Sequence, residues 1–273
     1  MDTISDNLIH FLGRTHIQSP SKQFEIFTSI IENGLRTGNI SVAFPASGVI
    51  HNSIVCFTDL PLKFCDRHTA LYGKFGIGFK KSYIKNVGGN PAMYFVDHSP
   101  TETNDATLIE TRGIAGLNFG AIQRFILKLS KQVNLSKETS MISEGEVIIT
   151  NEELVDLQSS CLYALSFLKE IGDLGVARDE SEDIDPYYKE REWRLVPSKG
   201  NEINKTIVFD KEKNTCHYKF NRKDVNCIIV PDIDMRKKVN NYLNSFGKDE
   251  QQHLKEFTED PPPVFVYDDL RRW

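Results

Sequence analysis

Short apolar runs, separated by polar turns and by segments of helical spacing, recur along this chain. Three of them, residues 54–57, 75–79 and 93–96, predict neighbouring strands of one small sheet. Residues 66–72 between the first two runs have helical spacing, and a Gly-Gly-Asn-Pro turn precedes the third. We expect the other elements to pack around this sheet.

The rest of the chain mixes strand and helix patterns without an internal repeat. Residues 8–12 predict a first strand, and residues 22–33 predict an amphipathic helix that ends at Gly34. Further strands are predicted at 144–150, 190–197, 203–209, 215–220, 225–231 and 264–267, and further helices at 114–129, 154–171 and 234–246. The pattern predicts one α+β domain over residues 1–273. Its mixed, mostly antiparallel sheet is split by a mainly helical insertion at residues 104–173.

Two glycines interrupt the side-chain pattern of the 75–79 strand. Gly76 and Gly78 alternate with Phe75, Ile77 and Phe79, so one face of this strand is almost bare. A bare face allows either the close packing of a helix or the approach of a ligand. The glycines lie inside the strand and lack the GxGxxG spacing, which argues against a phosphate-binding loop.

Polar residues directly follow the 54–57 strand. Asp59 at an N-cap and Pro61 in a first turn would begin a helix. Alternatively, Phe57 and Thr58 form a ledge for a flat ligand, with an aromatic ring beside a hydroxyl group. The sequence is compatible with both arrangements.

A second charged stretch lies late in the chain. Read as a strand, residues 190–197 place Glu190, Glu192 and Arg194 in one row. Neighbouring carboxylates raise each other's proton affinity, whereas the positive charge of Arg194 lowers the proton affinity of both. One of the two acids could therefore stay ionised and stabilise a cationic centre, and the other could accept a proton. The alternative is a solvent-facing strand whose opposite charges pair. The acidic residues 173–188 before it predict an exposed, mobile loop.

Composition and charge narrow the function classes. No apolar run is long enough for a membrane helix, and the N-terminus lacks a secretory pattern, so we expect a cytoplasmic protein. Five cysteines without CxxC pairs predict buried thiols, and the scattered histidines predict no metal site. A net charge of −5 disfavours non-specific nucleic-acid binding.

Several of these motifs together resemble the AbiGi family of abortive phage-resistance proteins. They are residues 55–62, the Tyr-Gly-x-Phe-Gly-Ile-Gly-Phe run at 72–79, Asn90-Pro91 and Tyr94. Members of that family are described as antitoxins of a bacterial defence system against phage. The resemblance covers about the first hundred residues, and more weakly residues 190–194 and the strand and helix that begin at Val225. It implies a toxin or another defence protein as the partner.

A looser pattern is similar to ADP-ribosyltransferase-like domains. It consists of His10 in the first strand, a helix ending at Asn33-Gly34-Leu35, Phe57-Thr58, and the late Glu-x-Glu-Trp-Arg strand. The resemblance implies an ADP-ribosyltransferase-like fold and NAD as the substrate.

The same resemblance implies roles for individual residues. Glu192 would be the catalytic acid that stabilises the oxocarbenium-like centre formed as nicotinamide leaves, and Glu190 would orient or deprotonate the acceptor. His10 would hold the adenosine-side ribose, although a lone strand histidine is more often structural. The remaining NAD-binding candidates are Phe57, Thr58, Arg194 and, for stacking on nicotinamide, Tyr72 with Tyr83 and Tyr94 as alternatives.

Two functions therefore follow from the sequence. One is an anti-phage protein that cleaves NAD and passes ADP-ribose to protein, nucleic acid or water; the other is a non-catalytic antitoxin that binds and neutralises a toxin. No convincing helix-turn-helix supports a repressor. If His10, Phe57 and Glu192 converge in one cleft, the enzyme hypothesis gains, and if they lie apart, it falls. The oligomeric state has no signature in the sequence.

Overall fold

The chain divides into two compact units. The computed structural model describes residues 6–13, 19–44, 48–96, 128, 142–144, 147–149, 151–171, 191–210, 215–247 and 251–270. The first unit comprises Met1–Gly38, Ser53–Pro91 and Glu190–Trp273, and the second comprises Asn39–Asn52 and Ala92–Lys189. The stretch predicted as a helical insertion into a single domain, residues 104–173, lies wholly within the second unit.

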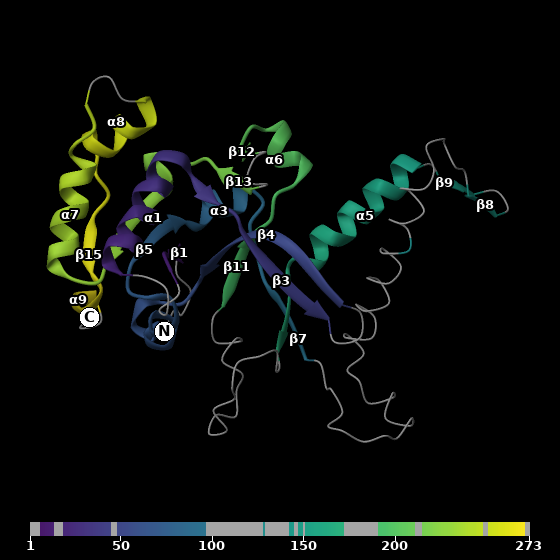
Figure 1. The fold of residues 1–273 in the computed structure, drawn as a ribbon, viewed down its shortest axis with the longest axis horizontal. Coiled ribbons are helices and arrows are strands. Elements are labelled where there is room, and N and C mark those ends of the chain that lie inside the picture. Colours follow the sequence, from purple (N-terminus) through teal and green to yellow (C-terminus); the bar gives the residue numbers. More distant parts are fainter. Residues whose placement is uncertain are drawn as a thin grey trace, which may run out of the picture. The chain divides into compact units, whose positions relative to one another are not determined.

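Most of the described elements belong to the first unit (Figure 1). Its strands are β1 (Asn7–Phe11), β2 (Leu35–Arg36), the second half of β4 (Gly48–Thr58), β5 (Gly76–Lys80), β6 (Asn90–Pro91), β11 (Glu192–Leu195), β12 (Ile207–Asp210), β13 (Thr215–Tyr218), β14 (Val225–Val230) and β15 (Val264–Val266). Its helices are α1 (Pro20–Asn33), α2 (Asp66–Tyr72), α3 (Lys81–Asn86), α6 (Lys199–Ile203), α7 (Ile233–Leu243), α8 (Gln252–Glu259) and α9 (Tyr267–Leu270).

The second unit contains the remaining described elements. They are β3 (Gly38–Phe44) with the first half of β4, β7 (Met93–Val96), β8 (Ile142–Glu144), β9 (Val147–Ile149), α5 (Asn151–Leu165) and β10 (Leu168–Ile171). β7 and β10 pair in parallel, and β8 and β9 form an antiparallel pair. The helix predicted at 154–171 therefore ends at Leu165, and its last residues are strand. The predicted helix at 114–129, apart from Lys128, and the acidic loop at 173–188 lie outside the described residues.

The main sheet has the strand order β15-β14-β5-β1-β4-β11-β6, and β3 also pairs with β4. β14 and β15 are parallel, whereas β14, β5, β1, β4, β11 and β6 pair antiparallel in that order. A separate sheet has the order β12-β13-β2 and is antiparallel. The α+β class with mixed, mostly antiparallel sheets is therefore confirmed.

One prediction about strand neighbours is wrong. The runs 54–57, 75–79 and 93–96 all form strands, but β1 lies between β4 and β5, and β7 pairs with β10 instead. Alternation of apolar residues identifies a strand and its buried face, but it does not identify the partner strand. The partner is set by packing between distant segments.

The two faces of the main sheet have different neighbours. The core face carries Phe57, Ile77 and Leu195, which pack with apolar side chains of α1, α7 and α8. Phe27, Ile31, Val239 and Phe257 are among the fully buried members of this cluster. Helix α1 has its N-cap at Ser19 and a proline in its first turn, and Gly34 ends it with φ +97°.

The opposite face, here called the glycine face, carries Gly76 and Gly78. A Cβ on Gly78 would lie 2.7 Å from Cys227 Sγ, and one on Gly76 would lie 3.1 Å from Ile9 Cγ2. The space beside both glycines is thus filled by side chains from the neighbouring strands β14 and β1. Of the two alternatives for the bare face, the structure shows close packing, with strand side chains in place of the expected helix.

Two global features of the described residues bear on function. No described helix has the length and apolar character needed to cross a membrane. All five cysteines lie in described segments, and none of them forms a disulfide. Cys65 and Cys216 are buried.

Candidate functional site

Strand register separates the predicted site residues into two groups. In antiparallel pairs, directly opposite residues point to the same face of the sheet. Ile9 and Glu192 both lie opposite Thr58, on the two sides of β4. Thr58, Glu192 and Arg194 therefore lie on the glycine face. His10 and Phe57, each one residue away, lie on the core face.

Glu192 and Arg194 form a buried ion pair on the glycine face. Arg194 Nε donates to Glu192 Oε1 at 2.8 Å, and both residues are less than a tenth exposed. Removal of both charges from water requires such pairing, because an unpaired buried charge is strongly unfavourable. The predicted row of Glu192 and Arg194 is thus present, but Arg194 engages the carboxylate of Glu192. Glu190 lies outside the described residues.

Asp59 does not cap a helix. The first turn after β4 is a short 3-10 segment, Leu62–Phe64, with Pro61 at its N-cap. The Asp59 carboxylate instead accepts from Lys81 Nζ at 2.8 Å and lies 3.5 Å from Arg191 Nη2. Its Oδ1 atom is buried without a hydrogen-bond partner within the described part of the chain.

The backbone around Asp59 also holds the start of β11. Asp59 N donates to the carbonyl of Arg191, which has φ +45°, an uncommon value for a residue other than glycine. Lys81 Nζ lies 5.2 Å from the ring centroid of Trp193, a cation–π contact. Sequence pattern favoured a helix cap because an aspartate two residues before a proline fits that role locally. The ion pair depends on Lys81 and Arg191, which are remote in sequence.

His10 has a structural setting. Its Nδ1 donates to the carbonyl of Cys56 at 2.8 Å, and its ring centroid lies 5.6 Å from that of Phe57. A carbonyl only accepts, so the proton lies on Nδ1. Burial lowers the pKa of His10 from 6.5, and the hydrogen bond to Cys56 partly opposes this. The structural alternative considered for a lone strand histidine fits this environment.

The tyrosine candidates lie in different places. Tyr72 packs against the apolar cluster of the glycine face, and its ring centroid is 4.5 Å from that of His68. The Tyr83 hydroxyl donates to the carbonyl of Lys219 at 2.9 Å, and burial, followed by the charge of Asp224, raises its pKa. Tyr94 lies on β7 of the second unit. Tyr72 is therefore the candidate that shares a face with Glu192.

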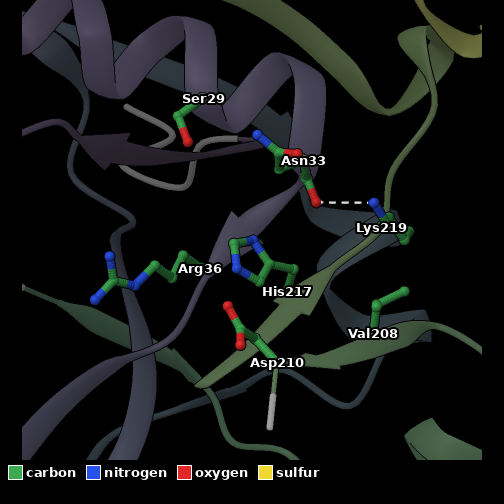
Figure 2. A pocket seen from close by; sticks show the side chains of 7 residues that line it. All are labelled: Ser29, Asn33, Arg36, Val208, Asp210, His217 and Lys219. Carbon is green, nitrogen blue, oxygen red and sulfur yellow. Dashed lines mark hydrogen bonds between the residues drawn. The ribbon is translucent and has the colours of Figure 1, made fainter. Parts of the chain in front are cut away.

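A pocket that was not anticipated from the sequence lies between the end of α1 and the three-stranded sheet. Its volume is about 330 Å³. Figure 2 shows the ring of His217 in the middle of the group, with the Arg36 and Lys219 side chains on either side of it and Asp210 below it. The other lining residues are Ser29, Asn33 and Val208.

Part of this pocket is indicated by the sequence, because apolar and polar residues alternate along β13 and the residues after it. Cys216, Tyr218 and Phe220 are buried in the main apolar core, so His217 and Lys219 between them point away from it. His217 also pairs with Arg36 of β2 and Val208 of β12. The alternation can be recognised in the sequence, whereas the pairing of His217 with Arg36 cannot.

The described residues contain no group of three or more histidine, cysteine or acidic side chains arranged to hold a metal ion. The polar features that remain are the Glu192–Arg194 pair, the Asp59 ion pairs and the pocket around His217. The first two are internally paired. The pocket is open to solvent through exposed residues, among them Ser29, Asn33 and Arg36.

Comparison with known proteins identifies one family. The family model described as "Putative abortive phage resistance protein AbiGi, antitoxin" matches residues 46–231, more than half of the chain. The matched segment includes Glu192, Arg194 and the β12 and β13 side of the pocket. No curated protein and no solved structure matches the chain.

Proposed function

Since this chain belongs to the AbiGi family, we propose that it is the antitoxin of a bacterial abortive-infection system and neutralises a partner toxin by binding it. The observation that carries this proposal is the family match over residues 46–231, because the family description names both phage resistance and an antitoxin. Neutralisation by binding requires an accessible surface and no chemistry.

Exposed apolar side chains in the first unit are consistent with this proposal. Ile203 at the end of α6 is 78% exposed, and Val208 and Phe209 of β12 are about half exposed. Large exposed apolar side chains are available for contact with another protein. All three residues fall within the segment that the family model matches.

The proposal is tested by expressing the proteins encoded by the genes that neighbour the gene of this chain, as candidate toxins. Cells that express the toxin should stop growing, and co-expression of this chain should restore growth. The purified proteins should form a complex that elutes as one species in size-exclusion chromatography. A toxin that arrests growth equally in the presence of abundant, folded chain would refute the antitoxin function.

A matched pair of substitutions locates the binding surface. Phe209→Glu should weaken the complex by about tenfold or more, because a large apolar contact is lost. Phe64→Glu is the control, since Phe64 is 55% exposed but lies on the segment after β4. Equal affinity of the two variants would place the toxin-binding surface elsewhere without touching the antitoxin proposal.

A second candidate function is NAD cleavage by an ADP-ribosyltransferase-like fold. It is favoured by the position of Thr58, Glu192 and Arg194 on one face of two neighbouring strands, β4 and β11, whereas the position of His10 and Phe57 on the other face counts against it. In this reaction the C1′–N bond to nicotinamide breaks, nicotinamide leaves with the electron pair, and C1′ joins an oxygen of water or of an acceptor that loses its proton.

Calorimetric titration with NAD and a nicotinamide-release assay test this second candidate. The expected result is binding, with release that Glu192→Gln abolishes while the variant still binds NAD. The absence of binding or release by the well-folded protein would remove the candidate. Because Glu192 is paired with Arg194, the unfolding transitions of the wild type and of Glu192→Gln must be measured in parallel with these assays.

A further inference from the structure

The pocket around His217 results from a close approach of helix α1 to strand β13. Gly34 ends α1, and a Cβ at this position would collide with the carbonyl oxygen of Tyr218. The chain then enters β2, where Arg36 pairs with His217, and Thr37 N donates to the carbonyl of Cys216 at 2.8 Å. The last turn of α1 therefore forms one wall of the pocket, and the outward face of β12-β13-β2 forms its floor.

Two cationic side chains, Arg36 and Lys219, line this pocket. The Arg36 side chain is exposed and makes no hydrogen bond or ion pair with any residue that the structure describes. Lys219 Nζ donates to the carbonyl of Asn33 at 2.9 Å, which uses one of its three hydrogens (Figure 2). Both side chains thus have donors available for a ligand. The protein as a whole carries a net charge of −5, whereas cations outnumber anions among the residues that line this pocket.

His217 adds a polar atom at the floor of the pocket. Its Nδ1 is buried and makes no hydrogen bond of good geometry with a described residue, while the imidazole also interacts with the backbone of Gly34. A buried polar atom without a partner is unfavourable and is normally satisfied by water or a ligand. A ligand that offers an oxygen here would accept a hydrogen bond from an N–H of the imidazole and lie beside the two cations.

Asp210 limits which ligands fit. Its carboxylate lines the same pocket, and the carbonyls at the end of α1 also carry partial negative charge. The net local charge therefore favours a ligand with a single negative group over a polyanion such as nucleic acid. A volume of about 330 Å³ is at the lower end of the range for small-molecule sites.

We propose that this pocket binds the carboxylate or phosphate group of a small metabolite, held by Arg36 and Lys219 with His217 beneath it. Arg36 binds the oxyanion through its planar fork, which suits either group. The apolar side chain of Val208, on the floor beside His217, contacts the uncharged part of the ligand. This site goes beyond the antitoxin function and is independent of it, because it requires no partner protein.

The test is a titration of the intact, isotope-labelled protein followed by amide chemical shifts. The probes are L-glutamate for the carboxylate group, inorganic phosphate for the free phosphate group, and adenosine monophosphate for a phosphate on a larger body. Saturable shifts should appear at residues 33–37 and 215–219. The probe that binds most tightly identifies which oxyanion the site takes.

Two variants and one control distinguish binding at this site from non-specific electrostatic binding elsewhere on the protein. Arg36→Gln should weaken the best probe by about tenfold or more, the effect of one lost charge-assisted hydrogen bond. Lys219→Gln should act similarly, but it also removes the contact to Asn33, so Arg36→Gln is the decisive change. Lys223→Gln is the control, since Lys223 is exposed but does not line the pocket.

Each outcome decides the proposal. Saturable binding that Arg36→Gln weakens and Lys223→Gln leaves unchanged supports it. No saturable shift with any probe at millimolar concentration overturns it, as does binding that both variants weaken equally. A failure of the toxin-binding experiment has no bearing on this result, because the titration contains this chain alone.

Discussion

The imidazole of His10 and the carboxylate of Glu192 lie on opposite faces of the main sheet. Ile9 and Glu192 are both in register with Thr58, so His10, the next residue, points to the core face. The two side chains therefore have separate environments: His10 contacts Phe57 and the carbonyl of Cys56, and Glu192 pairs with Arg194. Substitutions at the two positions should have separate and additive effects on stability.

The Glu192–Arg194 pair gives the largest expected effect on stability. Arg194→Met removes the guanidinium that pairs with the buried carboxylate of Glu192 and should lower the free energy of unfolding by about 3–5 kcal/mol. The double variant Glu192→Gln, Arg194→Met should be destabilised by clearly less than the sum of the two single variants. Urea denaturation of the four proteins measures this coupling. Additive losses would contradict the pairing shown at 2.8 Å.

Replacement of Gly78 by alanine should be tolerated only when the side chain at position 227 is made smaller. A Cβ at Gly78 would lie 2.7 Å from Cys227 Sγ, while the nearest backbone atom of Cys227 is 3.6 Å away. Gly78→Ala should therefore lower the free energy of unfolding by about 1–3 kcal/mol, the usual effect of overpacking. Adding Cys227→Ala should recover much of the loss, as measured by thermal unfolding.

Gly34→Ala is the matched contrast to this rescue. At Gly34 the obstacle is the backbone carbonyl of Tyr218, and φ is +97°, which disfavours any residue with a Cβ. We expect a loss of stability that no side-chain substitution nearby recovers. Rescue of Gly34→Ala by a change at Tyr218 would contradict this explanation.

His10 should make the protein less stable in mild acid. Because burial lowers its pKa below 6.5 in the folded protein, the unfolded chain binds the additional proton between the folded pKa and 6.5. The contribution of this residue is therefore fully present above pH 6.5 and is lost as the pH falls through the folded pKa. The slope is at most about 1.4 kcal/mol per pH unit.

The comparison of wild type with His10→Gln isolates this contribution. Urea denaturation at pH 8 and at pH 5 should show a smaller loss of stability for the variant than for the wild type. His217 contributes with the same sign in both proteins, because burial lowers its pKa as well, and it cancels in the difference. If the loss of stability between pH 8 and pH 5 were identical in the two proteins, the protonation of His10 would not differ between the folded and the unfolded state.

Two thiols should resist alkylation in the folded protein. Burial, with a smaller effect of Asp66, raises the pKa of Cys65 to about 12, and burial raises the pKa of Cys227 to about 11. Since the thiolate is the reactive form, iodoacetamide at pH 8 should modify both at least about a hundredfold more slowly than in urea. Mass spectrometry of the peptides measures this. Rapid modification of Cys65 would indicate that the segment after β4 opens in the native state.

Local sequence pattern predicted those helices and strands whose periodicity and capping residues lie within one short segment. The helix that ends at Gly34, strands β1, β5 and β14 and helix α7 were all predicted, because periodicity and capping chemistry act between near neighbours in sequence. The faces of β11 were also predicted, with Trp193 and Leu195 opposite Glu192 and Arg194. The AbiGi family was recognised from motifs alone and is confirmed over residues 46–231.

The candidate site shows where local pattern was insufficient. Asp59 was predicted as a helix cap and instead forms ion pairs with Lys81 and Arg191. The pocket around His217 was missed, because its cations come from segments about 180 residues apart. Neither result follows from spacing along the chain, since both depend on which strands become neighbours.

The sequence by itself determined the strands and helices named above, the alternating faces of the strands and the family, because each of these is encoded within a short segment. The tertiary structure decided that β1 separates β4 from β5, that His10 and Glu192 lie on opposite faces, and that Arg36 lies beside His217. The physical reason is that strand order and register are set by the packing of distant side chains into one core, and a one-residue change in register moves a side chain to the other face.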